Sequence, residues 1–256
     1  MKNVVICGST GFIGRATLDI IQRHPQRFRV FGLAAHTQKD LLIKQIQKFK
    51  PRFVVFTGQH EKLLEIEGTE YFYGQEGLEL LATHPETDIL VMAISGLGGL
   101  VSTLKALDAG KVIALATKEI IVCAGHLLNG RAGKILPVDS EHNAIFQIVD
   151  REKSGVSGIV LTASGGPFLN YEGSLSMVTV KQVLNHPVWK MGQRITVDSA
   201  TLMNKGLEFI EAFYLFGINR ENISVVLHPQ AIIHGFVKFC DGFVKAVISI
   251  PDMKYS

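Results

Sequence analysis

Asn3-Val-Val-Ile-Cys-Gly-Ser-Thr-Gly-Phe-Ile-Gly14 is a short apolar strand, a glycine-rich turn and the start of a helix. This order is the context in which a dinucleotide fingerprint operates. The glycines let the backbone approach a pyrophosphate, and the helix N-terminus supplies amide donors and a positive dipole. Because the glycine spacing is looser than in the strictest form of the fingerprint, a purely structural turn is the alternative. In this context we interpret the segment as a nucleotide-binding turn.

Apolar strands and helical patterns alternate along the following hundred or so residues. The expected strands lie at 28–35, 52–57, 88–95 and 111–117, and the expected helices at 40–49, 61–66, 76–83, 100–109 and 119–128. Regular alternation of this kind predicts a parallel sheet covered by helices on both faces. The fold class of residues 1–139 is therefore α/β, with a Rossmann-type doubly wound sheet.

The pattern changes in residues 140–256. The expected helices lie at 141–149, 179–184 and 207–215, and the expected strands at 158–162, 195–200, 223–227, 231–239 and 243–250. Cys240-Asp-Gly242 makes the last two strands a hairpin. We expect an α+β domain in which a mixed or mainly antiparallel sheet carries helices on one face.

The junction between these two parts reads Leu136-Pro-Val-Asp-Ser-Glu-His-Asn-Ala-Ile-Phe-Gln147. Asp139 and Glu141 lie two residues apart where a strand turns into a helix, so both can face one hard cation such as Mg²⁺ or Mn²⁺. Alternatively, Asp139 or Ser140 caps the helix and Glu141 only interacts with its dipole. Glu208 and Glu211 share a distant helix face, and either could supply a third carboxylate.

The loop after the second strand indicates which dinucleotide is bound. NAD enzymes usually place an acid there to bind the ribose hydroxyls. This chain has Ala34-Ala-His-Thr-Gln-Lys39 instead, in which His36, Thr37 and Lys39 could receive a 2′-phosphate. The loop favours NADP(H), with an ordinary polar loop as the alternative.

Three further segments carry polar groups suited to an anionic substrate. Ala163-Ser-Gly-Gly-Pro167 follows a strand and suits either an anion nest or a tight turn. Ser199, Asn204 and Lys205 cluster near a helix start, where phosphate binds well. The loop 185–192 contains the only tryptophan, Trp189, and is either a closing lid or a segment packed on the core.

Composition limits the other classes of function. The net charge of +3 is too small to argue for nucleic acid or an anionic membrane as a partner, and no apolar run is long enough to span a bilayer. The first strand follows Met1 directly, so we expect no targeting peptide. Cys7, Cys123 and Cys240 are expected to be reduced, buried thiols in a cytoplasmic protein.

Together these motifs resemble those of the 1-deoxy-D-xylulose 5-phosphate reductoisomerase family. Members of this family act in the methylerythritol phosphate pathway of isoprenoid biosynthesis. The matching segments are 8–14, 136–147, Ala163-Ser-Gly-Gly-Pro-Phe168, His186-Pro-Val-Trp-Lys-Met-Gly192, Val197-Asp-Ser-Ala-Thr-Leu-Met-Asn-Lys-Gly-Leu-Glu208 and His228-Pro-Gln230. The resemblance implies NADPH- and metal-dependent conversion of 1-deoxy-D-xylulose 5-phosphate to 2-C-methyl-D-erythritol 4-phosphate. It also implies a homodimer and the metals Mg²⁺ or Mn²⁺, with Co²⁺ as a further candidate.

The resemblance also assigns roles to individual residues. The implied metal ligands are Asp139, Glu141 and Glu208, and the implied catalytic residues are Lys118, Glu141 and His186. The implied substrate-binding residues are Ser140, Glu141, Ser164, His186, Ser199, Asn204, Lys205 and Glu208. The implied cofactor-binding residues are Thr10, Gly11, Phe12, Ile13, Ala35, His36, Thr37, Lys118, Glu119 and Gly192.

Two departures from the family pattern matter. The loop after the second strand lacks the Gly-Lys-Asn often seen there, so the contacts to a 2′-phosphate are left open. Family members also continue beyond the equivalent of Ser256 into a linker and a helical domain, so we expect a truncated chain with impaired activity and uncovered apolar surface.

The alternative function is that of a short-chain-dehydrogenase-like protein or NADP sensor. Its catalytic form needs a Tyr followed four residues later by Lys, which this sequence lacks.

Overall fold

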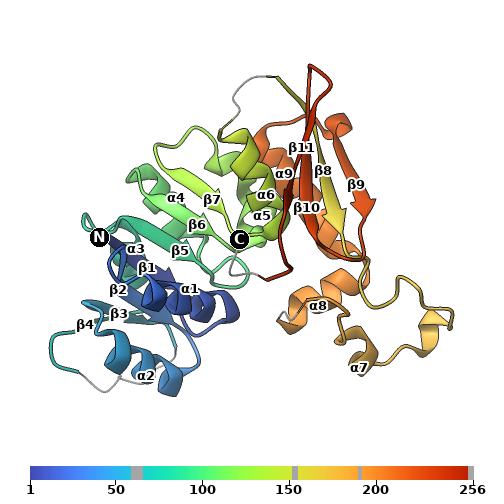
Figure 1. Ribbon diagram of the computed structural model, residues 1–256. Coiled ribbons are helices and arrows are strands. Elements are labelled where there is room, and N and C mark those ends of the chain that lie inside the picture. Colours follow the sequence, from blue (N-terminus) through green and yellow to red (C-terminus); the bar gives the residue numbers. More distant parts are fainter. Residues whose placement is uncertain (59–65, 152–154, 190–191, 253–256) are drawn as a thin grey trace. The chain divides into compact units, whose positions relative to one another are not determined.

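The chain forms two compact units, Met1–Pro137 and Val138–Ser256 (Figure 1). The structure is a computed structural model, and it describes residues 1–58, 66–151, 155–189 and 192–252. The helix expected at 61–66 therefore lies almost entirely outside the described residues, as do residues 190 and 191 of the expected closing loop.

The first unit contains a seven-stranded parallel sheet, which confirms the predicted Rossmann-type fold (Figure 1). Its strands are β1 (Lys2–Cys7), β2 (Phe28–Ala35), β3 (Phe53–Phe56), β4 (Glu70–Tyr73), β5 (Ile89–Met92), β6 (Val112–Leu115) and β7 (Lys134–Pro137). They lie in the order β4-β3-β2-β1-β5-β6-β7. The strand order reverses at β1, between β2 and β5, and a ligand crevice is expected outside the carboxyl ends of strands at such a point.

Helices from the same unit cover this sheet. They are α1 (Phe12–Arg23), α2 (Lys39–Phe49), α3 (Gly74–Thr83), α4 (Leu100–Asp108) and α5 (Lys118–Leu128). Leu18 of α1 and Leu42 of α2 pack in one core cluster with the strand residues Ile6 and Leu33. Burial of consecutive strand residues explains why these strands have continuous apolar sequences instead of alternating ones. The short strand β4 was not predicted.

The second unit contains a mixed four-stranded sheet in the order β11-β10-β8-β9. Its strands are β8 (Val156–Ala163), β9 (Ile223–Leu227), β10 (Ile233–Phe239) and β11 (Val244–Ile248). β10 pairs antiparallel with β8 and β11, whereas β8 and β9 are parallel. The predicted mixed sheet and its terminal hairpin are confirmed.

Helices α6 (Ser140–Val149) and α9 (Met203–Phe216) pack on this sheet around Ile145, Ile159, Ala212 and Val237. The shorter helical segments of the unit are η1 (Leu175–Met177), α7 (Val180–Val183), α8 (Gln193–Ala200) and η2 (Arg220–Asn222). Thr179 caps α7 through a capping box, as the sequence predicted.

The strand predicted at 195–200 is wrong, because this segment is the helix α8. Ile195, Thr196 and Val197 are β-branched and favour strands in isolation. In the fold the segment packs against α9, and tertiary contacts of this kind override a weak local preference. Thr196 also fits the helix locally, because its hydroxyl donates a hydrogen bond to the carbonyl of Gly192 one turn earlier.

The expectation of three buried thiols is correct only for Cys7. Burial raises the pKa of the Cys7 thiol to about 12. Cys123 and Cys240 are exposed, since α5 and the β10–β11 hairpin turn both present one side to solvent. Within the described ranges, none of the helices has both the length and the apolar character that crossing a bilayer requires.

Candidate metal and anion sites

The junction between β7 and α6 places two carboxylates in the second unit. Asp139 is the N-cap residue of α6, yet its side chain makes no capping hydrogen bond. Glu141 lies in the first turn, and the Ser140 hydroxyl donates a hydrogen bond to its Oε2 at 2.5 Å. Helix capping therefore does not account for the Asp139 side chain.

Glu208 of α9 joins these two residues. One carboxylate oxygen from each of Asp139, Glu141 and Glu208 lies within 4.8 Å of the others. Glu208 is almost completely buried, with 1% of its surface exposed. The fold thus gathers acidic side chains that are 67 to 69 residues apart along the chain into one cluster, which we call the carboxylate cluster.

A lysine ammonium group is also part of the carboxylate cluster. Lys205 Nζ donates to Glu141 Oε1 at 2.6 Å and also to Glu208 Oε2. Burial alone would lower the pKa of Lys205, but Glu141 and Glu208 raise it above its ordinary value. Burial and the neighbouring Glu208 carboxylate raise the pKa of Glu141 to about 7, against the opposing effect of Lys205.

The donor set of the carboxylate cluster fits a hard divalent cation. Mg²⁺ and Mn²⁺ prefer carboxylate oxygens, and three such residues leave coordination positions for water or substrate. The cluster already holds one cationic group, the Lys205 ammonium, against two of its members. The negative charge that stabilises this buried ammonium group also stabilises a divalent cation at the same place.

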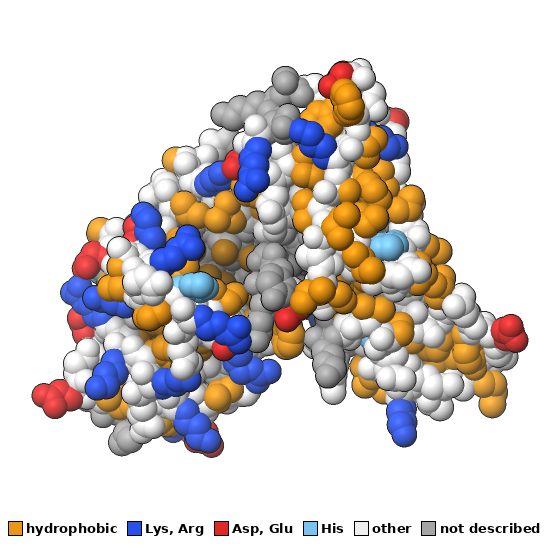
Figure 2. Space-filling model, viewed as in Figure 1, with side chains coloured by type: hydrophobic (Ala, Val, Ile, Leu, Met, Phe, Trp, Pro, Cys, Tyr) orange, Lys and Arg blue, Asp and Glu red, His pale blue; other side chains and the backbone are white. Residues whose placement is uncertain are grey.

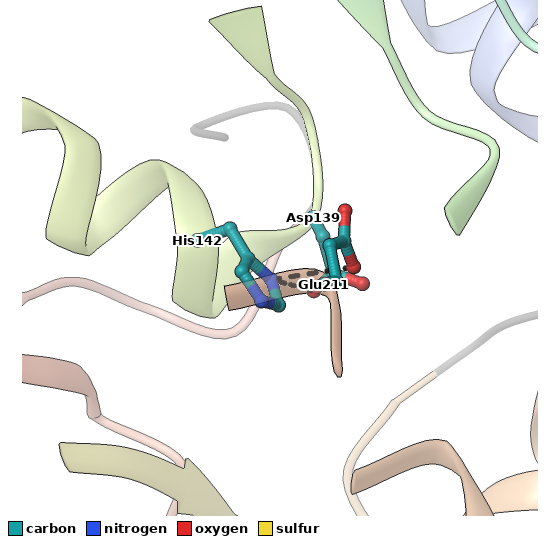
Figure 3. A group of neighbouring side chains, drawn as sticks. All are labelled: Asp139, His142 and Glu211. Atoms are coloured by element: carbon teal, nitrogen blue, oxygen red, sulfur yellow. Dashed lines mark ion pairs between the residues drawn. The ribbon is translucent and has the colours of Figure 1, made fainter. Parts of the chain in front are cut away.

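A second group, Asp139, His142 and Glu211, lies beside the carboxylate cluster (Figure 3). His142 is completely buried, and its Nε2 lies 2.9 Å from the Glu208 carbonyl oxygen. Its Nδ1 lies 3.5 Å from Glu211 Oε2 and 3.8 Å from Asp139 Oδ1 (Figure 3). Burial alone would lower the pKa of His142, but Glu211 and Asp139 raise it to about 9.

A carbonyl oxygen only accepts hydrogen bonds, so His142 Nε2 carries a proton and donates to Glu208. Nδ1 therefore faces the carboxylates of Asp139 and Glu211. A protonated imidazole presents an N–H group and a positive charge to these carboxylates, whereas the neutral ring presents the Nδ1 lone pair, which repels them. His142 was not among the predicted site residues, whereas Glu211 was predicted only as the alternative to Glu208 for a third carboxylate. For His142 the available signal was its position three residues after Asp139, at the start of the same helix.

A separate group of polar side chains is formed by Ser164, His186 and Ser199. Ser164 follows β8, Ser199 lies in α8, and His186 lies in the loop between α7 and α8. His186 Nε2 is 3.2 Å from Ser164 Oγ and 3.1 Å from Ser199 Oγ. We call these three residues the serine–histidine group.

Glycine allows the segments of the serine–histidine group to meet. Gly166 has a φ of 68°, and a Cβ atom there would lie 2.6 Å from the carbonyl oxygen of Ser199. The loop after β8 can therefore approach the end of α8 only because residue 166 has no side chain. The other two predicted phosphate ligands, Asn204 and Lys205, contact the carboxylate cluster instead. Asn204 donates from Nδ2 to Glu208 Oε1, and Lys205 donates to Glu141 and Glu208.

The glycine-rich turn of the first unit has the geometry of a nucleotide-binding turn. A Cβ atom on Gly14 would lie 2.3 Å from the Gly8 carbonyl oxygen, and one on Gly8 would lie 2.4 Å from the Ala93 carbonyl oxygen. Gly11 is the N-cap residue of α1, so no side chain covers the amides of the first helical turn. Open amides at a helix N-terminus fit a pyrophosphate.

The other predicted cofactor-binding residues lie at several different places. Thr10 and Gly11 lie in the glycine-rich turn, Phe12 and Ile13 begin α1, Ala35 ends β2, and His36 and Thr37 follow it. His36 is exposed, and its Nδ1 lies 3.0 Å from the Thr57 hydroxyl after β3. Lys118 and Glu119 begin α5 after β6, with Lys118 buried. Gly192 is the N-cap residue of α8 in the second unit.

Sequence comparison identifies relatives along almost the whole chain. A family model described as 1-deoxy-D-xylulose 5-phosphate reductoisomerase matches residues 4–125, and one for its C-terminal domain matches residues 135–216. The enzyme of that name from Geotalea daltonii is 50% identical, and that from Pelotomaculum thermopropionicum is 48% identical. Each match covers 99% of this chain and 69% of the relative.

Solved structures give the same result. A reductoisomerase in complex with NADPH, fosmidomycin and magnesium superposes with a TM-score of 0.88 at 37% identity, covering 99% of this chain and 67% of that one. The enzyme from Zymomonas mobilis in complex with NADPH also gives 0.88, at 38% identity, over 99% of this chain and 68% of that one. These similarities do not support the alternative of a short-chain-dehydrogenase-like cofactor sensor. The chain belongs to the 1-deoxy-D-xylulose 5-phosphate reductoisomerase family.

Proposed function

We propose that this chain carries the activity of its family, the conversion of 1-deoxy-D-xylulose 5-phosphate to 2-C-methyl-D-erythritol 4-phosphate in isoprenoid biosynthesis. The observation that carries the proposal is the carboxylate cluster, in which Asp139, Glu141 and Glu208 lie within 4.8 Å of one another. A nucleotide-binding domain alone has no need of such a cluster. The family relationship supplies the substrate class.

In the proposed enzyme, Asp139, Glu141 and Glu208 hold one divalent cation, Mg²⁺ or Mn²⁺. When bound, this ion supplies Lewis-acid stabilisation of negative charge that develops on substrate oxygens. NADPH, held at the turn around Thr10–Ile13, supplies the hydride. Gly11, the N-cap residue of α1, has no side chain that could occupy the amides of the first helical turn.

Other polar residues of the second unit orient the substrate. Lys205 and Asn204 contact the carboxylate cluster and can also donate to substrate oxygens. The serine–histidine group offers hydroxyl donors for a phosphate. Binding energy from the phosphate, remote from the reacting carbons, contributes to orientation and to closing the loop 185–192.

The test is NADPH oxidation followed at its absorbance band with 1-deoxy-D-xylulose 5-phosphate and Mg²⁺. We expect oxidation only when both are present and loss of turnover on chelation with EDTA. Oxidation that ignores the metal, or no oxidation with both present, contradicts the proposal. NADPH binding that persists without turnover would instead favour the cofactor-sensor alternative.

We also propose that the chain acts in the cytoplasm as a homodimer. Apolar side chains gather on the surface over β9–β11, among them Val226, Leu227, Val244 and Ile248 (Figure 2). Exposed apolar surface of this kind commonly marks a protein interface. Sedimentation equilibrium should give twice the mass of 28.1 kDa, and a monomer at micromolar concentration would contradict the dimer.

A further inference from the structure

The glycine-rich turn of the first unit is tied to helix α2 by one buried glutamine. Gln45 lies on the buried face of α2, together with the core residues Leu42 and Ile46. Its Oε1 accepts a hydrogen bond from the Ser9 hydroxyl at 2.8 Å, and its Nε2 donates to the Ser9 carbonyl oxygen at 2.9 Å. Ser9 is completely buried and Gln45 almost completely. One amide group thus holds both the side chain and the backbone of a single turn residue.

The third polar group of Ser9 also has a partner inside the fold. Its backbone amide donates to the carbonyl oxygen of Ala34 in β2 at 2.9 Å. Both donors of Ser9, the amide and the hydroxyl, are therefore used within the unit, so this residue anchors the turn and does not supply donors to an anion. Those donors come from the first residues of α1, because the first amides of a helix have no acceptor within the helix.

The start of α1 packs directly on this anchored residue. A Cβ atom on Gly14 would lie 2.6 Å from Ser9 Cα, so the first helical turn and the Ser9 backbone meet with no room for a methyl group. Because packing at this distance leaves no free space, a shift of Ser9 also moves the N-terminus of α1. The hydrogen bonds that fix Ser9 therefore also fix the direction of the helix amides.

A glutamine is a costly residue at this place in α2. A buried amide is unfavourable unless it is hydrogen-bonded, and an apolar side chain would continue the face formed by Leu42 and Ile46. The amide offers an acceptor and a donor at one end, which match the hydroxyl and the carbonyl of Ser9. Helix α2 begins at Lys39, directly after the loop that we expect to contact a 2′-phosphate. The Gln45 amide thus joins two segments of the proposed cofactor site.

We propose that Gln45 is a positioning residue for NADPH. Its amide fixes Ser9, and with it the amides at the start of α1, in the arrangement that binds the pyrophosphate. This inference rests on the proposed function for the cofactor and goes beyond it in assigning a role to a residue outside the turn. Without the Gln45 amide the turn samples other conformations, and the apparent affinity for NADPH falls in proportion to the fraction of molecules that remains competent to bind.

Three variants separate positioning of the turn from packing of the core. Gln45→Met keeps the length and the helix propensity of the side chain but loses both hydrogen bonds to Ser9. Ser9→Ala loses only the hydroxyl bond, because the Gln45 amide still donates to the carbonyl of residue 9. Ile46→Val is the matched control, since it removes buried apolar volume from the neighbouring position of α2 and lowers stability without removing a hydrogen bond to Ser9.

The measurements are the dissociation constant of NADPH, from the change in its fluorescence on binding, and the Tm, both on the full chain without Mg²⁺ or substrate. We expect Gln45→Met to bind NADPH about tenfold more weakly and Ser9→Ala about threefold, the effects of two hydrogen bonds and of one. Adding Ser9→Ala to Gln45→Met should cost nothing further, because the partner of the hydroxyl is already gone. Ile46→Val should lower the Tm and bind NADPH as the wild type does.

Hydrogen exchange of the free protein reports on the turn itself. The amides of residues 9–13 should exchange faster in Gln45→Met than in the wild type, and at the wild-type rate in Ile46→Val. Wild-type NADPH affinity in Gln45→Met, or an equal loss of affinity in Ile46→Val, would overturn the inference. Unchanged exchange in Gln45→Met would overturn it as well.

The outcomes for the inference and for the proposed function are distinguishable, because turnover is not measured. A wild-type chain that binds NADPH but does not oxidise it with substrate and Mg²⁺ contradicts the proposed function only, and the variants still decide the role of Gln45. A wild-type chain that does not bind NADPH contradicts both.

Discussion

Replacing Glu208 by glutamine should reduce turnover about a thousandfold while NADPH binding stays within about twofold of wild type. The amide keeps the size of the side chain but removes the negative charge, and neutral amide oxygens hold a hard divalent cation less strongly than carboxylates do. The Lewis-acid contribution of such a cation is several kcal/mol, and each 1.4 kcal/mol is about tenfold in rate, so we expect kcat to fall about 10³-fold. The proposed NADPH site is the turn of the first unit, whereas Glu208 belongs to the second unit.

Mg²⁺ affinity measured by calorimetry should fall together with kcat, which separates loss of the metal from a general loss of structure. Glu221→Gln is the matched control, since Glu221 is an exposed acid in η2 of the same unit. Unchanged turnover of Glu208→Gln at saturating Mg²⁺ would remove Glu208 from the ligand set. Wild-type Mg²⁺ affinity in an inactive variant would assign it another role in the site.

The parts of the fold that the sequence predicted have strong local signals. The turn at Gly8–Gly14 and the apolar strands of the Rossmann-type sheet are visible because buried parallel strands are apolar throughout. The strand β4 has only four residues and is partly exposed, so it carries no such run. At 195–200 the β-branched residues indicated a strand, and contacts of α8 with α9 favoured the helix instead.

The candidate site divides in the same way. Asp139 and Glu141 lie on one short junction, so their proximity follows from the sequence alone. Periodicity could not choose between Glu208 and Glu211, because residues three apart lie on one helix face. The structure distinguishes the two glutamates by their partners. Glu208 accepts hydrogen bonds from Lys205 and Asn204, whereas Glu211 faces His142 (Figure 3).

The serine–histidine group had no local signal that joins its members. Ser164, His186 and Ser199 lie on three separate segments, and only the packing of the β8 loop against α8 brings them together. The resemblance to a family identified them individually. Their hydrogen bonds arise only in the folded chain, and no pattern in the sequence indicates them.

Lys205→Met should make the stability of the protein depend strongly on Mg²⁺. Methionine keeps the aliphatic length but removes the ammonium that lies against Glu141 and Glu208. Breaking a buried ion pair by removing one partner costs about 3–5 kcal/mol, and 1 kcal/mol corresponds to about 2–4 °C in Tm for a protein of this size. The metal-free variant should therefore melt about 10 °C below the wild type.

Mg²⁺ should restore most of this loss, because the ion neutralises the same carboxylates and stabilises the folded state by mass action. In the wild type the increase in Tm with Mg²⁺ should be smaller, since the ion must compete with Lys205 for Glu141 and Glu208. Calorimetry at about pH 8 keeps Glu141 mostly ionised beside Lys205, since its pKa there is about 7. Lys181→Met, an exposed lysine in α7, is the control. If Lys205→Met and the wild type have equal melting temperatures and equal increases in Tm with Mg²⁺, the Lys205 ammonium does not neutralise the negative charge of the carboxylate cluster.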